Sequence, residues 1–266
     1  MRPTRPLQYI LEVERKFTPT PLSVSHLRTN TGTPRLPKIQ HCGSIIQKDI
    51  YFDRKDILCD NGIWVRQRKQ SLPKIDKTSF GDEKICGSGG IETLTEKREV
   101  SWQAKIRKGG DRVNSSFAEV HDYDSILDLL RCRFPSLADL KRIEDLGVLA
   151  RITCLREMWR VDGKFNVVID ETDFGHVVGE VELEVEFDTG GMGSGNGNEE
   201  WRGGLSGLVG GDRSGRNEEA ALLKNMDTEI ETFMRMYESA FPVEGRVVGK
   251  LTAYFEWLKA NEERYG

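Results

Sequence analysis

The sequence has little cysteine and histidine, and it lacks the short motifs of several common enzyme classes. Its five cysteines are odd in number and scattered, without a C-x-x-C pair, which is typical of a reducing compartment. The four histidines form no H-E-x-x-H pair, which argues against a zinc site. The absence of G-x-x-x-x-G-K-[ST] and G-x-S-x-G excludes a P-loop and a hydrolase nucleophile elbow.

Long apolar runs and a strong net charge are also missing. No apolar stretch approaches the ~20 residues that a membrane helix needs. The first six residues carry two arginines but are followed by no apolar signal-peptide core, so we expect a cytoplasmic protein. A net charge of −4 makes nucleic acid an unexpected partner, and any basic site must be local. We expect a monomer that binds neither nucleic acid nor membrane.

The length predicts one domain that spans residues 1–266. With 37% hydrophobic and 31% charged residues, the chain has enough apolar material for a single core. Two segments look like flexible insertions. Residues 71–99 are polar and contain the Gly-rich run at 87–90, and residues 189–217 are rich in Gly, Ser, Asn and Asp.

Strand patterns dominate the rest of the chain, so we predict an α+β fold that is mainly β. Apolar periodicity and turn residues predict strands over 10–17, 49–53, 62–68, 101–107, 116–120, 153–162, 164–170 and 179–187. Helical spacing of apolar residues predicts helices over 123–133, 218–240 and 250–262.

Alternation along these strands separates charged from apolar side chains. In the first strand Glu12, Glu14 and Lys16 share one side, opposite Leu11 and Val13. Taken alone, this pattern suits either a solvated strand face or a metal held beside a phosphate. The later strands repeat it, with charged faces that carry Arg66, Arg68, Lys105, Arg156, Asp170, Glu180 and Glu182.

Two architectures satisfy this pattern. In an open sheet, the apolar side packs on helices and the charged side faces water. In a closed barrel, the charges line the lumen and helices cover the outside. Burying lone ions costs several kcal/mol each, so such a lumen must be wet, internally paired and built for a highly charged ligand. Each outward apolar side chain covered by a helix returns ~1.5–3 kcal/mol.

Six blocks in order carry a resemblance to a known family. Residues 12–16 (Glu-Val-Glu-Arg-Lys) match the E-x-E-x-K signature of the CYTH superfamily, the triphosphate tunnel metalloenzymes. The match continues through the blocks 49–53, 64–68, Lys105 with Arg156, 168–182 and 250–254. Within that superfamily, the W-x-R-x-R and D-x-x-D-F-G-x-x-V-G-E-V-E blocks are most similar to the thiamine triphosphatases.

The resemblance implies an eight-stranded antiparallel β-barrel tunnel with a charged lumen and helices on the outside. It implies Mg²⁺ as cofactor, held by Glu12, Glu14, Asp170 and Glu182. It assigns substrate binding to Lys16, Trp64, Arg66, Arg68, Lys105, Arg156, Glu180 and Lys250. One position departs from the family, because Val168 stands where animal thiamine triphosphatases have an acid. The physical chemistry agrees, since Mg²⁺ prefers carboxylate oxygens and arginine forks suit phosphate oxygens.

The implied reaction is Mg²⁺-dependent hydrolysis of thiamine triphosphate to thiamine diphosphate and phosphate. An inorganic tripolyphosphatase, a nucleotide or RNA 5′-triphosphatase, and a catalytically silent phosphate-binding module are the alternatives. The residues do not identify the group that accepts the proton of water. Trp64 shares a strand face with Arg66 and Arg68, so it either plugs one end of the barrel or offers its indole to the thiazolium cation.

Overall fold

The computed structural model describes residues 8–73, 99–111, 113–188, 213–243 and 245–265. Both predicted insertions, 71–99 and 189–217, lie mostly outside these residues. Ser71 ends one strand and Glu99 begins the next, so both ends of the first segment belong to the sheet. The second segment was predicted too long, because residues 213–217 already form the start of a helix.

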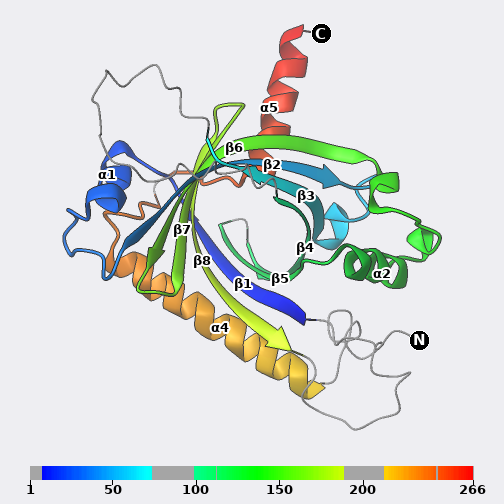
Figure 1. Ribbon diagram of the computed structural model, residues 1–266, viewed down its shortest axis with the longest axis horizontal. Helices are drawn as coiled ribbons and strands as arrows, with labels where there is room; N and C mark the ends of the chain where they lie inside the picture. The colour runs from blue at the N-terminus through cyan, green and yellow to red at the C-terminus, as the bar shows by residue number, and fades with distance from the viewer. Residues whose placement is uncertain (1–7, 74–98, 112, 189–212, 244, 266) are drawn as a thin grey trace, which may run out of the picture.

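The eight predicted strands form a closed barrel (Figure 1). Its neighbours follow the order β1-β5-β4-β3-β2-β6-β7-β8, and every pair is antiparallel. The first and last strands of this order, β1 and β8, also pair with each other, which closes the sheet. The closed barrel is therefore confirmed, and the open sheet is wrong. The strands are β1 (Gln8–Phe17), β2 (Gln40–Phe52), β3 (Ile63–Ser71), β4 (Glu99–Gly110), β5 (Asn114–Val120), β6 (Val148–Val161), β7 (Phe165–Thr172) and β8 (Val177–Asp188).

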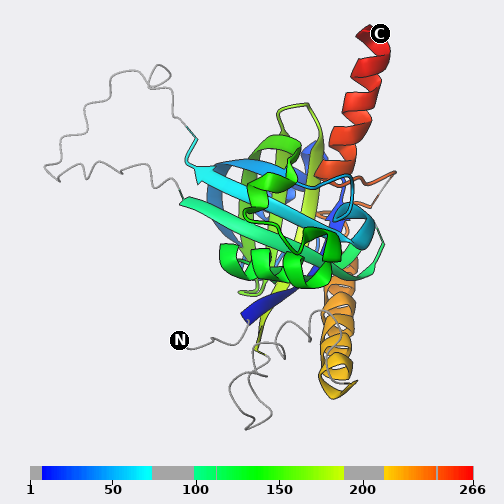
Figure 2. The ribbon, with the colours of Figure 1, turned by 90° about the vertical axis from the view of Figure 1, so that its right-hand side faces the viewer.

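Helices cover the outer face of the barrel. Helix α4 (Arg213–Met236) lies along β1 and β8, and α2 (Tyr123–Arg133) lies against β4 (Figure 1). Helix α5 (Lys250–Tyr265) starts at β6 and projects away from the barrel (Figure 2). Helix α1 (Pro21–Thr29) was not predicted, although Thr20 and Ser23 form a capping box at its start. Short 3-10 helices span Cys59–Asn61, Pro135–Leu137 and Ile143–Leu146.

The apolar faces of the strands form the core beneath these helices. Leu11 and Val13 of β1 are almost fully buried, as are Ile230 and Phe233 of α4. Their burial drives the strands to turn their charged faces inward, because each covered side chain contributes ~1.5–3 kcal/mol. In the part of the chain that the structure describes, no helix has the length and apolar character to cross a membrane.

Close packing at Gly179 helps to set the register of β8 on β1. Gly179 lies opposite Phe17, and a Cβ added there would come within 2.2 Å of the Phe17 ring. Only glycine leaves room for that ring. In the resulting register Glu180 lies opposite Lys16 and Glu182 lies opposite Glu14. The register thus brings the charged residues of β1 and β8 together inside the barrel.

Candidate functional site

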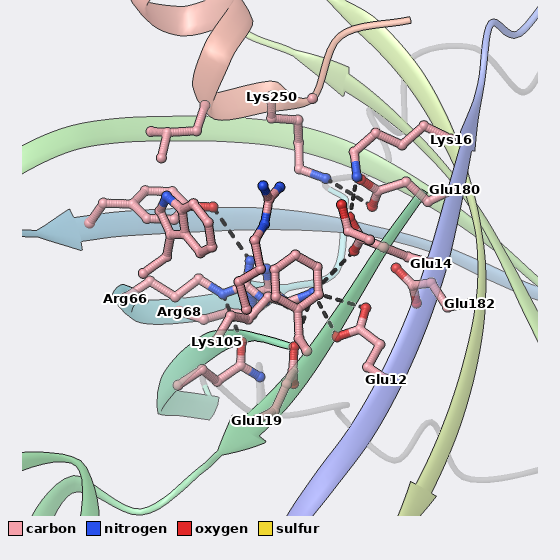
Figure 3. A pocket seen from close by; sticks show the side chains of 18 of the residues that line it. Glu12, Glu14, Lys16, Arg66, Arg68, Lys105, Glu119, Glu180, Glu182 and Lys250 are labelled. Carbon is pink, nitrogen blue, oxygen red and sulfur yellow. Dashed lines mark hydrogen bonds and ion pairs between the residues drawn. The ribbon is translucent and has the colours of Figure 1, made fainter. Parts of the chain in front are cut away.

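The lumen holds a cavity of about 250 Å³, and most of the predicted site residues line it (Figure 3). Eleven of the twelve predicted residues are in its lining, and Asp170 is the exception. The eleven are Glu12, Glu14, Lys16, Trp64, Arg66, Arg68, Lys105, Arg156, Glu180, Glu182 and Lys250. The carboxylates of β1 and β8 lie on one side of the cavity, and Arg66 and Arg68 of β3 lie across from them (Figure 3).

Three carboxylates form a compact cluster on the acidic side. Glu12 and Glu14 project from β1 and Glu182 from β8, and one oxygen from each lies within 4.8 Å of the other two. All three side chains are buried. Like charges this close repel one another unless a cation lies between them. The cluster therefore fits a hard divalent cation, which binds to carboxylate oxygens.

Two lysines partly neutralise this cluster. Lys105 Nζ lies 2.8 Å from Glu12 Oε1, 3.2 Å from Glu14 Oε2 and 3.0 Å from Glu119 Oε1, and Lys16 is paired with Glu14. Burial raises the pKa of Glu14, but Lys16 and Lys105 outweigh burial and lower that pKa. Glu14 is thus a carboxylate before any metal arrives.

Glu182 differs from Glu14 because no described residue pairs with its carboxylate. Among the described residues nothing donates a hydrogen bond to its carboxylate or forms an ion pair with it. Burial raises the pKa of Glu182 to about 7, and Glu180 and Glu14 add to the rise against the opposing effect of Arg156. Burial and Glu119 likewise raise the pKa of Glu12. These two groups gain most from a bound cation.

On the basic side, β3 presents two arginines to the cavity. Arg68 donates from Nε and Nη2 to the two oxygens of Asp49, both at 2.8 Å. Arg66 donates from Nε to Gln103 Oε1 at 2.8 Å, and its Nη1 lies 3.4 Å from the Tyr51 hydroxyl. Both guanidinium groups are buried and held in place, which suits recognition of an anion with several oxygens.

Asp170 occupies a different place from the one expected. It was predicted to be a metal ligand, yet it lies outside the three-carboxylate cluster. Both of its oxygens pair with Arg156, at 2.8 and 2.7 Å, and Oδ2 also pairs with Lys250. Arg156 and Lys250 outweigh burial and hold the pKa of Asp170 far below its usual range. Because Asp170 lies outside the cavity lining, it is placed to anchor these two cations from behind the lumen surface.

Glu180 lies among the same cations. Its carboxylate is 3.3 Å from Lys250 Nζ, 3.6 Å from Lys16 Nζ and 3.7 Å from Arg156 Nη2. The sequence interpretation placed this residue against the cationic part of the substrate or against a water. In the structure three protein cations lie near its carboxylate, and Glu180 also lines the cavity. Val168, the departure from the family pattern, is buried and lies opposite Glu180 in the β7–β8 register.

The sequence interpretation left several lining residues without a role. Alternate positions of β5 and the residue after it place Ser115, Phe117, Glu119 and His121 in the cavity wall. His121 Nε2 lies 2.9 Å from Glu119 Oε2, and Glu119 also contacts Lys105. Period-two alternation was the available signal, but the predicted strand over 116–120 left out Ser115 and His121. Asp49 lay inside a matched block, yet its pairing with Arg68 was missed.

Trp64 faces the cavity, as the alternation predicted. It is half-buried and meets Phe117 edge-on at 5.9 Å between ring centroids. The exposed guanidinium of Arg107 lies 5.6 Å from the centre of its ring. Trp64 also packs against the small apolar cluster of Tyr51, Ala150 and Ile152. The indole therefore forms an apolar part of the cavity wall, and one cation, the Arg107 guanidinium, lies against its ring.

Three solved structures resemble this chain at 14% identity. The PH1819 protein of Pyrococcus horikoshii has a TM-score of 0.46, with coverage of 94% of this chain and 99% of that one. A putative adenylyl cyclase from Hippeastrum, described with a dominant triphosphatase activity, has a TM-score of 0.44 and coverage of 93% and 95%. A putative adenylate cyclase from Vibrio parahaemolyticus has a TM-score of 0.40 and coverage of 94% and 98%.

The family comparison covers the strands that build the lumen. A family model described as the CYTH domain matches residues 11–190, which include all eight strands except the first residues of β1. The match spans more than half of the chain. The protein therefore belongs to the CYTH domain family, whose members are metal-dependent triphosphate tunnel enzymes.

Proposed function

We propose that this protein is a Mg²⁺-dependent hydrolase that converts thiamine triphosphate to thiamine diphosphate and phosphate. One observation carries the proposal: an indole lies in the wall of the same cavity as the phosphate-binding cations and the three-carboxylate cluster. The cations suit any triphosphate. Trp64 suits a substrate whose organic part is a flat cation, and the thiazolium ring of thiamine is one.

Glu12, Glu14 and Glu182 would hold the Mg²⁺ ion. Their chemistry fits, because the cluster is buried and acidic, and no described residue pairs with the carboxylate of Glu182. When bound, Mg²⁺ would offset the negative charge that develops on the phosphate oxygens. Asp170 is not among the proposed ligands, since it lies outside the three-carboxylate cluster and outside the cavity lining.

The remaining lumen cations would bind the phosphate chain. Arg66 and Arg68 project from β3, Arg156 from β6, and Lys250 from the first turn of α5. Together with Lys16 and Lys105 they would surround the chain and align it for in-line attack. In the reaction, the oxygen of water forms a bond to the terminal phosphorus. The bond between that phosphorus and the bridging oxygen breaks, and thiamine diphosphate leaves.

A substrate panel tests this proposal. Purified protein with Mg²⁺ is offered thiamine triphosphate, inorganic tripolyphosphate and ATP, and phosphate release is measured for each. We expect the highest kcat/KM for thiamine triphosphate. Preference for tripolyphosphate or ATP would instead identify an inorganic tripolyphosphatase or a nucleotide triphosphatase. Binding of all three without phosphate release would identify a phosphate-binding module.

Replacing Trp64 separates recognition of the organic part from recognition of the phosphates. Trp64→Ala should lower kcat/KM for thiamine triphosphate by roughly 3- to 30-fold, because a cation–π contact contributes ~0.5–2 kcal/mol. Hydrolysis of inorganic tripolyphosphate should stay nearly unchanged. Trp257→Ala, which removes a tryptophan outside the cavity lining, is the matched control and should alter neither rate. Equal losses on both substrates would make Trp64 structural.

A further inference from the structure

Asp49 lies behind the basic side of the cavity and contacts both arginines of β3. Its side chain is 4% exposed and is not part of the cavity lining. Both oxygens accept from Arg68 at 2.8 Å, and Oδ2 lies 3.7 Å from Arg66 Nη1. The β2–β3 register places Asp49 directly opposite Arg68. The bidentate contact is therefore built by the strand pairing itself.

This contact leaves part of the Arg68 guanidinium available to a ligand. A guanidinium carries five N–H donors in a fixed plane. Asp49 engages one at Nε and one at Nη2, and no described residue accepts from Nη1. Arg68 itself lines the cavity. Asp49 therefore binds one edge of the Arg68 guanidinium. The other three N–H donors of Arg68 contact no described residue.

A second layer of hydrogen bonds holds Asp49 in turn. Gln47 Nε2 donates to Asp49 Oδ2 at 3.2 Å and lies 3.9 Å from Cys154 Sγ. Cys154 Sγ lies 3.5 Å from Asp170 Oδ1. Asp170 accepts two hydrogen bonds from Arg156, as Asp49 does from Arg68. All of these side chains are buried. One polar layer thus connects the carboxylates that hold the two arginines.

We infer that Asp49 is a positioning residue for phosphate recognition, which it serves by holding Arg68 with its free N–H donors toward the lumen. The inference rests on the proposed function, because it assumes that the lumen binds a phosphate chain. It assigns no contact between Asp49 and substrate. Because the Arg66 contact is longer, at 3.7 Å, removing Asp49 should matter mainly while Arg68 is present.

A double-mutant cycle tests this dependence. Asp49→Asn keeps the shape of the side chain but places an NH₂ group against an arginine donor, which breaks the bidentate contact. We expect kcat/KM for inorganic tripolyphosphate and thiamine triphosphate to fall roughly 10- to 100-fold, the range seen when the outer partner of a binding residue is lost. Most of the loss should appear in KM. Asp139→Asn, which changes an exposed aspartate in a turn outside the cavity lining, is the control and should change neither constant.

The second arm of the cycle distinguishes positioning from support of the fold. In the Arg68→Ala background, Asp49→Asn should cause no further loss, and it should recover some activity because it removes a buried carboxylate that lacks its main partner. Equal losses in both backgrounds, or no loss from Asp49→Asn alone, would overturn the inference.

Failure of the proposed function would be visible separately. If the unmodified protein hydrolyses no triphosphate, the same four proteins are compared by calorimetry for binding of inorganic tripolyphosphate. Non-additive dissociation constants would then keep the positioning role while the hydrolase proposal falls. If the unmodified protein hydrolyses triphosphates normally but the effects of the two substitutions are additive, the hydrolase proposal stands and the positioning role of Asp49 falls.

Discussion

The two sides of the tunnel carry opposite charge, and they are prepared for their ligands in different ways. On the basic side, Arg68 and Arg156 each face an aspartate directly across a strand pair, and each forms two hydrogen bonds to it. On the acidic side, Glu182 has no such partner within the described residues. The arginines are oriented before an anion arrives, whereas Glu182 is left for a cation to bind.

This difference follows from the cost of buried charge. A buried ion without a partner costs several kcal/mol, and a carboxylic acid escapes that cost by holding its proton, whereas arginine stays charged in proteins. The arginines are therefore held by aspartates, and the pKa values of Glu12 and Glu182 rise. Binding of an anion then needs little rearrangement on the basic side, while binding of a metal exchanges protons on the acidic side.

Removal of a proposed metal ligand should have the largest effect. Glu14→Gln should lower kcat with Mg²⁺ by at least ~100-fold, since loss of even an outer partner of a metal ligand costs 10–100-fold. It should also destabilise the metal-free protein, because Lys16 and Lys105 would lose a buried carboxylate. Steady-state kinetics and thermal melting measure the two effects.

Glu12→Gln sharpens the same comparison. Its carboxyl has a raised pKa and holds its proton more readily, so the neutral amide should cost less stability than the change at Glu14. The loss of activity should be similar. If both variants melt at the same temperature as the unmodified protein and keep full activity, the cluster does not bind the metal used in turnover.

The pH dependence of metal binding should be the next largest effect. The pKa of Glu182 is raised to about 7, so below that pH its proton must leave before Mg²⁺ can bind. The apparent Mg²⁺ affinity should fall by up to about tenfold per pH unit from pH 7 to pH 5. Calorimetric titrations in two buffers with different ionisation enthalpies count the released protons. No proton release at pH 6 would contradict the assignment, and Glu186→Gln on the exposed end of β8 is the control.

Which residues face the lumen was predictable from sequence, because alternation along a strand is a local property. Glu12, Glu14 and Lys16, and likewise Trp64, Arg66 and Arg68, share the sides that the pattern indicated. Closure of the barrel was left open by the pattern, since it depends on β1 pairing at both edges.

The partners of these residues were not predictable from alternation. Asp49 meets Arg68, and Asp170 meets Arg156, only because the β2–β3 and β6–β7 registers place them directly opposite one another. Register depends on bulges, turns and packing that span many residues. Asp170 was therefore expected to bind metal, although the strand beside it supplies an arginine. The part of β2 over 40–48 was missed because it carries mostly polar residues and a glycine, with no apolar alternation at its start.

The smallest expected effect concerns the stability of the metal-free protein. In the folded state the pKa of Glu182 is raised from 4.5 to about 7, so the folded protein holds this proton where the unfolded chain has lost it. Ionisation of this group in the unfolded chain therefore opposes folding progressively as the pH rises from about 4.5 to 7, by up to about 3 kcal/mol. Glu182→Gln removes that pH-dependent cost, while its buried amide adds a constant one of ~1–3 kcal/mol. Denaturant unfolding of both proteins in EDTA measures their free energies of unfolding. Between pH 5 and pH 8 the value for the variant should rise relative to that of the unmodified protein. A difference that stays constant with pH would mean that Glu182 has a partner in solution and that the acidic side, like the basic side, is complete without its ligand.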